Sequence, residues 1–286
     1  MNNYTFVIPL YNDWVSINLL LLKINKEFKS KGKQANVLII NDASSDKIKI
    51  NIKNLSCIKK IKILNLKENI GSQKAILIGL KYLKKNKKNS TIIVMDSDGE
   101  DDPAKLFQMI NKAEKNDNLI VFAKRTQRLE SLILRILNFV RLLVTYILTG
   151  RYIDIGNYSV FSNKNLNNIL SNDNTALAYC SGVLKNCKKI EFVGIKKKKR
   201  YFGLSKVKTS FLIKHSIKII SVFLSNLLVR SAIISIILII LLKNSNITSL
   251  IIFFLITLNL ICLFYNITKK FDSRLEKLIK SELFYK

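Results

Sequence analysis

The sequence contains little of the chemistry that builds zinc sites or disulfide frameworks. Its 286 residues include a single histidine, His215, and four cysteines, at positions 57, 180, 187 and 262, none of them in a CxxC pair. Zinc sites and disulfide scaffolds need closely spaced cysteine or histidine residues, so neither is expected here. A reducing, cytosolic setting is the corresponding expectation.

Several nucleotide-binding and nucleic-acid-binding signatures are also missing. No glycine-rich dinucleotide fingerprint and no GxxxxGK[ST] loop follows a predicted strand, which argues against Rossmann dehydrogenases and P-loop enzymes. No helix-turn-helix, RNP-like or zinc-finger pattern occurs either, so nucleic acid is not an expected partner.

Acidic residues are scarce: 19 Asp and Glu stand against 48 Lys and Arg, a net charge of +29. Lys, Asn and Ile are over-used together, as an AT-rich genome would produce for any function, so charge alone identifies no partner. The densest basic run, Lys196–Arg200, precedes the apolar segments, and we expect it to face anionic lipid headgroups. Because 49% of the residues are hydrophobic, the chain is predicted to fold rather than remain a disordered polycation.

Short runs rich in Ile and Val alternate with segments of helical periodicity. The runs predicted as buried strands are Tyr4–Pro9, Ala35–Asn41, Ile61–Leu66, Thr91–Asp96 and Asn118–Phe122. Apolar residues at helical spacing predict the intervening helices Val15–Lys29, Ile70–Lys85 and Pro103–Lys115. This alternation predicts an α/β domain with a mainly parallel, Rossmann-like sheet, whose ligands bind at the carboxyl ends of the strands.

The fourth predicted strand is followed by five carboxylates within residues 96–102, a group that requires a counter-charge. Asp96 and Asp98 straddle one residue of an extended segment, so both side chains can face the same side. Such oxygen ligands suit Mg²⁺ or Mn²⁺, and a metal held there would bridge a diphosphate leaving group. The alternatives are a solvated turn for this pair and a helix cap before Pro103 for Asp101 or Asp102.

A second candidate phosphate site lies at Arg200-Tyr201-Phe202-Gly203-Leu204-Ser205-Lys206. A bidentate guanidinium, a hydroxyl and an ammonium around a flexible glycine suit phosphate oxygens. The alternative is a solvated basic loop.

The C-terminal third is predicted to meet a membrane. Phe211–Val229 alternates apolar with basic or polar residues, as in an interfacial helix, and Thr248–Ile267 is long enough to span a bilayer. Ser231–Leu242 has only twelve residues, so it spans by extension back to Asn226 or is re-entrant. Basic residues crowd the flanks at 196–218 and 269–280 and place both ends in the cytosol. No charged and apolar leader precedes the first strand, so the sheet domain is expected to stay there too, beside the inner membrane.

Four motifs, in order, resemble the inverting glycosyltransferases of family 2, which have the GT-A fold. They are Val7-Ile8-Pro9-Leu10-Tyr11-Asn12, Asn41-Asp42-Ala43-Ser44-Ser45-Asp46, Asn69-Ile70-Gly71 with Ala75 and Gly79, and Asp96-Ser97-Asp98. The resemblance covers roughly residues 4–210 and is strongest to polyprenyl-phosphate sugar transferases of the dolichol-phosphate mannose synthase type. It implies transfer of a sugar, with inversion, from a nucleotide diphosphate sugar to a polyprenyl phosphate.

The resemblance also implies donor-side roles. Pro9, Tyr11, Asp13 and Asp42 would line the nucleotide pocket, with Asp42 accepting hydrogen bonds from the base. Asp96 and Asp98 would hold the diphosphate through Mg²⁺ or Mn²⁺. Glu100 stands where relatives often carry Gln, and it would be a third metal ligand.

On the acceptor side, Arg200 and Lys206 would join the catalytic group, while Arg125, Arg135 and Ser205 would bind the acceptor phosphate. Arg128 or Arg141 is an alternative to the first two arginines, and Asp154-Ile155-Gly156-Asn157-Tyr158 would shape the acceptor pocket.

No acidic E-D element that would supply a base occurs between residues 160 and 215. A lipid phosphate explains this, because with a second pKa near 6 it is already mostly dianionic at neutral pH. The alternatives are a family 2 transferase acting on a polysaccharide or glycolipid hydroxyl, which needs a base, and a catalytically idle membrane scaffold. The sugar, the choice between UDP and GDP, and the oligomeric state, with a homo-oligomer allowed, stay open.

The predicted organisation has four parts: a glycosyltransferase domain over residues 1–210, an amphipathic helix over 211–230, a transmembrane hairpin over 231–267 and a basic cytosolic tail over 268–286.

Overall fold

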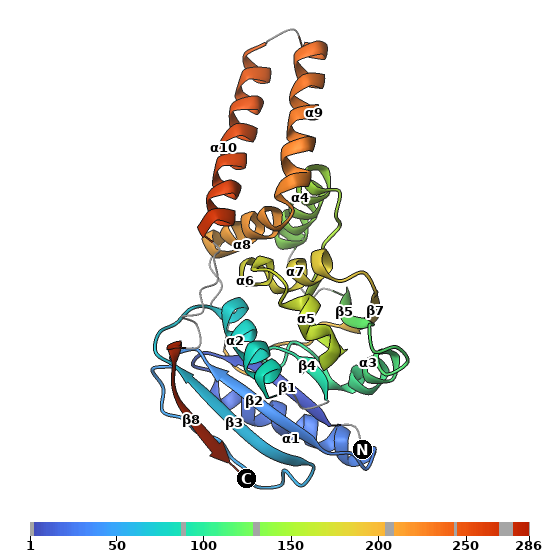
Figure 1. The fold of residues 1–286 in the computed structure, drawn as a ribbon, viewed down its shortest axis with the longest axis vertical. Coiled ribbons are helices and arrows are strands. Elements are labelled where there is room, and N and C mark those ends of the chain that lie inside the picture. The colour runs from blue at the N-terminus through green and yellow to red at the C-terminus, as the bar shows by residue number, and fades with distance from the viewer. Residues whose placement is uncertain are drawn as a thin grey trace. The chain divides into compact units, whose positions relative to one another are not determined.

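The computed structural model describes residues 3–86, 90–127, 132–203, 209–242, 245–268 and 277–285 (Figure 1). The chain divides into two compact units. The first, called the sheet unit, comprises Met1–Leu129, Ile155–Lys206 and Phe271–Lys286. The second, called the helical unit, comprises Glu130–Asp154 and Val207–Lys270. The predicted boundary at residue 210 therefore misses the segment around 130–154, which belongs with the C-terminal helices.

The described part of the sheet unit holds one eight-stranded sheet of order β7-β5-β6-β4-β1-β2-β3-β8. Its strands are β1 Tyr4–Leu10, β2 Ala35–Asn41, β3 Ile58–Leu66, β4 Thr91–Val94, β5 Ile120–Gln127, β6 Ile155–Ser162, β7 Ile190–Lys196 and β8 Ile279–Tyr285. Strands β4, β1, β2 and β3 are parallel neighbours, whereas β6 runs antiparallel to β4 and β5. The mainly parallel α/β sheet and its five predicted strands are confirmed.

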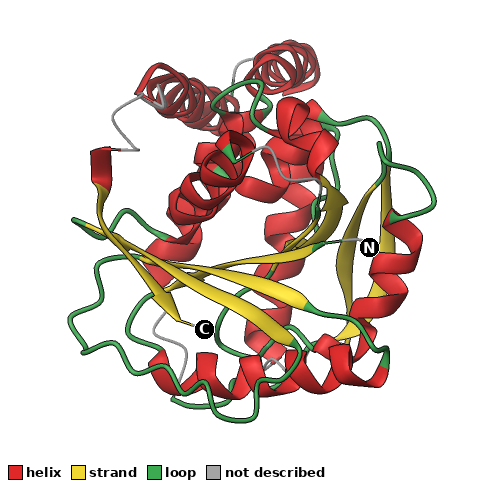
Figure 2. Ribbon diagram, turned by 60° about the horizontal axis from the view of Figure 1, so that its bottom comes forward, coloured by secondary structure: helices red, strands yellow, loops and turns green. Residues whose placement is uncertain are grey.

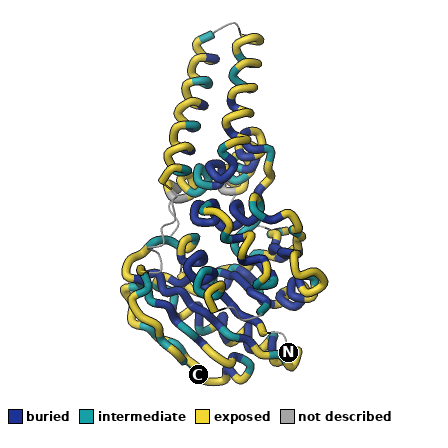
Figure 3. The backbone as a smooth tube through the Cα atoms, viewed as in Figure 1, coloured by how far each residue is buried: buried dark blue, intermediate teal, exposed yellow. Residues whose placement is uncertain are grey.

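Helices cover both faces of this sheet (Figure 2). They are α1 Trp14–Ser30, α2 Ser72–Lys85, the 3-10 turn η1 Pro103–Lys105, α3 Leu106–Ala113, η2 Asn163–Asn165, α5 Leu166–Ile169, α6 Asn174–Leu177 and α7 Tyr179–Asn186. Alternate residues of β1 serve opposite faces: Phe6 and Ile8 share a core with α1 and α3. Val7 faces α2, where a Cβ on Gly79 would lie 2.7 Å from the side chains of Val7 and Ile40. All of β1 is buried, as the central strands in Figure 3 show.

The C-terminal residues of the described chain are not a tail. β8 pairs antiparallel with β3, from Ile61 opposite Tyr285 to Leu66 opposite Ile279. Leu283 and Tyr285 pack against the main core, while Lys62 Nζ lies 2.9 Å from Glu282 Oε2. The predicted basic tail is therefore wrong for residues 279–285, which form an edge strand of the sheet with Leu283 and Tyr285 packed against the core.

The helical unit contains four helices among its described residues: α4 Leu132–Thr149, α8 Thr209–Val222, α9 Leu224–Leu242 and α10 Asn246–Thr268. The predicted interfacial helix is shorter than expected, because α8 ends at Val222 and α9 begins at Leu224. The twelve-residue segment Ser231–Leu242 is thus the C-terminal part of a 19-residue helix. At 1.5 Å per residue, α9 is about 28 Å long. Both α9 and α10 are long and apolar enough to cross a membrane.

Polar side chains connect the helices of the helical unit. The last carbonyls of α4 accept hydrogen bonds from α9: Arg230 Nη1 donates to Ile147 O at 3.1 Å and Asn226 Nδ2 to Thr149 O at 3.2 Å. Asn259 Nδ2 of α10 donates to Ser231 Oγ of α9 at 2.8 Å. Arg230 therefore caps the C-terminus of α4, where a cation also complements the helix dipole.

The β8 strand yields a stability prediction. Leu283→Ala should lower the free energy of unfolding of the sheet unit by about 1–2 kcal/mol, less than for a fully buried leucine, because Leu283 is partly buried. Trp14 is the only tryptophan and lies in the sheet-unit core, so its fluorescence during urea unfolding reports this unit. Lys280→Ala, at an exposed position of the same strand, is the control. Equal midpoints for the two variants would show that β8 adds nothing to the core.

Candidate active site

The carboxyl ends of β1, β2 and β4 converge on one pocket, as expected for parallel strands. A cavity of about 220 Å³ is lined by Pro9, Leu10, Tyr11, Asp13, Asp42, Ser72, Asp96, Ser97, Asp98 and Arg200. A neighbouring cavity of about 450 Å³ shares Tyr11, Asp13 and Arg200 and extends to Trp14, Lys47 and Phe202. The structure thus brings together all four residues predicted for the nucleotide with Asp96, Asp98 and Arg200.

Asp42 holds the loop that precedes α2. Its two carboxylate oxygens accept hydrogen bonds from the backbone amides of Ile70, at 2.8 Å, and Gly71, at 2.9 Å. Burial raises the pKa of Asp42, and these two amides partly oppose that rise. Gly71 has φ +84°, a conformation that favours glycine. The role of Asp42 visible in the structure is therefore to shape the pocket wall.

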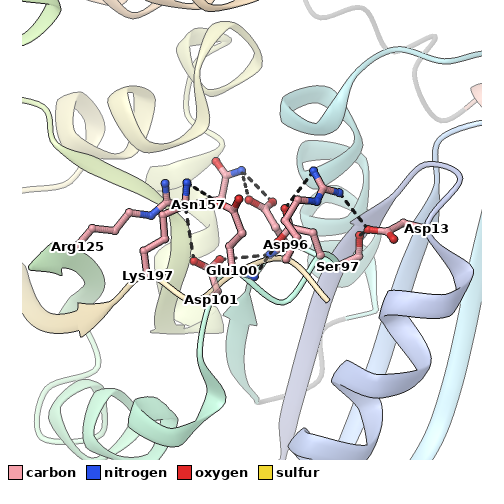
Figure 4. A network of polar contacts seen from close by, with 10 residues as sticks. Asp13, Asp96, Ser97, Glu100, Asp101, Arg125, Asn157 and Lys197 are labelled. Atoms are coloured by element: carbon pink, nitrogen blue, oxygen red, sulfur yellow. Dashed lines mark hydrogen bonds and ion pairs between the residues drawn. The ribbon is translucent and has the colours of Figure 1, made fainter. Parts of the chain in front are cut away.

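Five cationic contacts neutralise the acidic loop, residues 96–102, and Figure 4 shows those of Arg125 and Lys197. Glu100 Oε2 lies 3.0 Å from Lys197 Nζ and 3.7 Å from Arg125 Nη2, which is also 3.8 Å from Asp101 Oδ1. Lys198 Nζ lies 3.3 Å from Asp102 Oδ2. The expectation that the run Lys196–Arg200 faces lipid headgroups is therefore wrong for these two lysines, because their ammonium groups pair with Glu100 and Asp102.

Arg200 links the loop to the end of β1. Its Nη1 lies 3.7 Å from Asp98 Oδ2 and its Nη2 lies 3.5 Å from Asp13 Oδ2. Arg200 Nε is buried and has no hydrogen-bond partner among the described residues. The guanidinium therefore occupies the space between two carboxylates where a cation is needed.

Backbone pairing places Arg200 at this position. Lys198 N donates to Glu100 O and Tyr201 N donates to Asp98 O, both at 3.0 Å. Between these carbonyls, Gly99 has φ +83°, and a Cβ there would lie 2.3 Å from the Tyr201 ring. Lys23 Nζ lies 4.3 Å from the centroid of the same ring. The close approach of Tyr201 thus requires glycine at position 99 for both backbone and space.

Two carboxyl groups of the loop have strongly raised pKa values. Burial, followed by the charges of Asp101 and Asp98, raises the pKa of Asp96 to about 7, and the hydrogen bond from Asn157 opposes the rise. Burial also raises the pKa of Asp101 to about 6, while Arg125 lowers it. A cation placed beside these carboxyl groups would favour their ionised forms and so stabilise the folded loop.

The residues predicted to hold a metal separate into two sets. Asp96 and Asp98 line the pocket, whereas Glu100 is turned to Lys197 and Arg125 and does not line it. Within the described residues, no three acidic, histidine or cysteine side chains are placed to hold a metal by themselves. Arg200 already places a cation beside Asp98. The two carboxylates of Asp96 and Asp98 nevertheless fit Mg²⁺ or Mn²⁺, which takes its other ligands from water and phosphate.

The remaining predicted residues fall outside this pocket. Arg125 neutralises the acidic loop, and Arg135 lies on α4 in the helical unit. Ser205, Lys206 and the alternative Arg128 lie outside the described residues. Asp102 caps η1 by accepting from Ala104 N at 3.2 Å, which confirms the capping alternative.

Several contacts with the loop were not predicted, including those of Arg125 and Lys198 described above. Asn157 donates to Asp96 and Lys197 pairs with Glu100. Asn157 and Asp96 are 61 positions apart in the chain, and no sequence spacing could connect them.

The chain belongs to glycosyl transferase family 2, because the family model matches residues 5–182. It is 29% identical over 126 residues to the uncharacterized glycosyltransferase YkcC of Bacillus subtilis, covering 44% of this chain and 38% of that protein. It is 27% identical over 135 residues to the putative glycosyltransferase CsbB of the same organism, covering 47% and 40%. The matched region is less than half the length of these relatives. The predicted family is confirmed.

Solved structures share the fold at low identity. Glucosyl-3-phosphoglycerate synthase from Mycobacterium tuberculosis in complex with Mn²⁺, UDP and phosphoglyceric acid matches with TM-score 0.54 and 13% identity, over 79% of this chain and 78% of that chain. Its complex with Mg²⁺ and UDP matches with TM-score 0.50 and 13% identity, over 79% of each chain. The likeness confirms the predicted GT-A type of sheet.

The contact between Gly99 and Tyr201 is testable against a second glycine. Gly99→Ala should destabilise the sheet unit by about 2 kcal/mol or more, since it combines a left-handed backbone with a displaced aromatic ring. Gly203→Ala is the control, because φ there is +70° and no atom lies within 4 Å of the added Cβ. Urea unfolding followed by Trp14 fluorescence measures both, and a Gly203→Ala loss as large as that of Gly99→Ala would refute the steric role.

Proposed function

We propose that this protein transfers a sugar, with inversion, from a nucleotide diphosphate sugar to a polyprenyl phosphate at a membrane. The observation that carries the proposal is the single pocket in which Tyr11, Asp13, Asp96, Asp98 and Arg200 meet. Membership of glycosyl transferase family 2 and two helices suited to a bilayer support it.

The two adjoining cavities suit the donor. Tyr11 and Phe202, each about half exposed at 50% and 49%, offer aromatic surface in the larger cavity for a base. Asp96 and Asp98 in the smaller cavity would hold Mg²⁺ or Mn²⁺, which when bound neutralises the departing diphosphate. The Mycobacterium tuberculosis enzyme of the same fold was crystallised with Mn²⁺ and UDP, which favours a UDP-sugar as the first donor to test.

Arg200 is placed to respond to the donor. In the structure its guanidinium neutralises Asp13 and Asp98. With a metal beside Asp98, the same guanidinium is available for phosphate oxygens, which it can bind bidentately. Arg200 would then stabilise the negative charge that develops as the diphosphate leaves.

A phosphate acceptor agrees with the carboxylates of the pocket. Asp13 pairs with Arg200, Asp42 accepts from two backbone amides, and Asp96 and Asp98 face the metal position. A lipid phosphate needs no base, because it is mostly dianionic at neutral pH. Its oxygen would attack the anomeric carbon from the side opposite the diphosphate, which inverts that centre.

The helical unit supports a membrane site for this reaction. We propose that α9 and α10 cross the inner membrane as a hairpin, with the sheet unit and the C-terminus in the cytosol. Basic residues on both sides of the hairpin would then lie on the cytosolic face.

The first prediction concerns turnover. Radiolabelled sugar should pass from one of a panel of UDP- and GDP-sugars to undecaprenyl phosphate in detergent with Mg²⁺ or Mn²⁺, and not with EDTA. Asp98→Asn should lower the rate about 100-fold or more, while Asp117→Asn, an exposed carboxylate paired with Lys164, should leave it unchanged. Near-normal rates for Asp98→Asn in excess Mn²⁺ would refute the metal assignment.

The same assay separates the alternative functions. Label found only in hydroxyl acceptors would identify the protein as a transferase that needs a base. If the protein neither transfers nor hydrolyses any sugar nucleotide, it is an idle scaffold.

The second prediction concerns topology. A reporter inserted at Ser245, in the turn between α9 and α10, should lie on the side opposite the cytosol, while a reporter at the C-terminus should be cytosolic. The reporter is a single cysteine introduced at each position in turn. Its reactivity toward a membrane-impermeant thiol reagent provides the measurement. A Ser245 position that reacts only from the cytosolic side would contradict the hairpin.

A further inference from the structure

A chain of side-chain amides connects the start of α7 to Asp96. Tyr179 N donates to Gln73 Oε1 at 2.6 Å, and Gln73 Nε2 donates to Asn157 Oδ1 at 3.2 Å. Asn157 Nδ2 then donates to Asp96 Oδ1 at 3.1 Å and to Oδ2 at 3.5 Å. Figure 4 shows Asn157 directed at Asp96. Three elements, α7, α2 and β6, thus act in sequence on one carboxylate that lines the pocket.

This series of hydrogen bonds can run in only one direction. A backbone N–H can only donate, so the amide of Tyr179 requires the oxygen of Gln73, and the NH₂ group of Gln73 is left for Asn157. Asn157 must then present its oxygen to Gln73 and its NH₂ group to Asp96. Each side-chain amide has one consistent orientation, and the last donor in the chain faces the carboxylate.

We propose that Gln73 is a positioning residue for Asp96, acting through Asn157. This inference rests on the proposed function, in which Asp96 faces the metal and the diphosphate. Gln73 and Asn157 do not line the pocket, whereas Ser72, the neighbour of Gln73, does. One NH₂ group, that of Asn157, bonds both oxygens of Asp96, and the same carboxylate lines the pocket.

The acidic loop explains why such positioning is needed. Asp98 and Asp101 repel the carboxylate of Asp96, and no cation lies in direct contact with it among the ion pairs that the described residues form. A neutral donor holds the orientation of the carboxylate without neutralising it. A lysine or arginine at position 157 would instead compete with the metal for Asp96.

Gln73→Glu tests this series of hydrogen bonds without changing a residue that lines the pocket. The new carboxylate keeps an acceptor for Tyr179 N but replaces the donor to Asn157 by an oxygen. The amide of Asn157 should then turn its NH₂ group to the new carboxylate and its oxygen to Asp96, which repels it. We expect the affinity for Mn²⁺ in the presence of UDP, or of GDP if the wild type binds that nucleotide, to fall about tenfold.

The sign of this effect is diagnostic. An added negative charge near the pocket should by itself strengthen Mn²⁺ binding, so a weaker affinity points to reorientation of Asn157. Isothermal titration at pH 8 keeps the introduced carboxylate ionised, and nucleotide affinity in EDTA should stay unchanged. Lys74→Gln, an exposed neighbour with the same change in net charge, is the control and should bind Mn²⁺ no more weakly than the wild type does.

A double-mutant cycle completes the test. In an Asn157→Ala background, Gln73→Glu should cause no further loss of Mn²⁺ affinity, because the connection to Asp96 is already missing. Trp14 fluorescence during urea unfolding verifies that each variant is folded. An equal loss in both backgrounds, or wild-type affinity in Gln73→Glu, would overturn the positioning role alone. A wild type that binds neither nucleotide with Mn²⁺ would instead overturn the donor assignment and, with it, the role of Asp96.

Discussion

Charge neutralisation of the acidic loop is the constraint on which the site depends. Five carboxylates within residues 96–102 would repel one another, and β5 and the segment after β7 supply the opposing charges through Arg125, Lys197, Lys198 and Arg200. These cations do not cover every carboxylate equally. Burial raises the pKa of Asp96 to about 7. Among the described residues the side-chain amide of Asn157 bonds this carboxylate and no ion pair includes it, so the loop keeps one carboxylate without a paired cation.

The same loop is held by rigid local geometry. Two backbone hydrogen bonds join residues 98–100 to 198–201, and Gly99 leaves space for the ring of Tyr201. On the opposite side, Asn157 and Gln73 fix the direction of Asp96. A site of the proposed kind, for a metal and a diphosphate, needs side chains held in one orientation before the ligand arrives. In this protein, elements that lie far apart in the chain hold Asp96 and the acidic loop.

The chain leaves the sheet unit twice and returns each time. Residues 130–154 and 207–270 form the helical unit, and β8 then pairs with β3 at the edge of the sheet. The return covers a strand edge that would otherwise expose unpaired backbone groups. It also anchors the sequence after α10 to the unit that carries the pocket.

The sequence by itself determined the parallel α/β sheet, the pocket at the strand ends and the apolar helices, because burial patterns and motifs are local signals. It identified Pro9, Tyr11, Asp13, Asp42, Asp96, Asp98 and Arg200, which follow the strands directly or stand in a recognisable motif. Only the tertiary structure decided that the Lys196–Arg200 run meets the acidic loop, that Glu100 turns away from the pocket, that the C-terminal residues form β8, and that Gln73 reaches Asp96 through Asn157. The physical reason is that ion pairs, strand pairing and hydrogen-bond direction depend on which distant segments the fold brings together, and a periodic pattern carries no record of those partners.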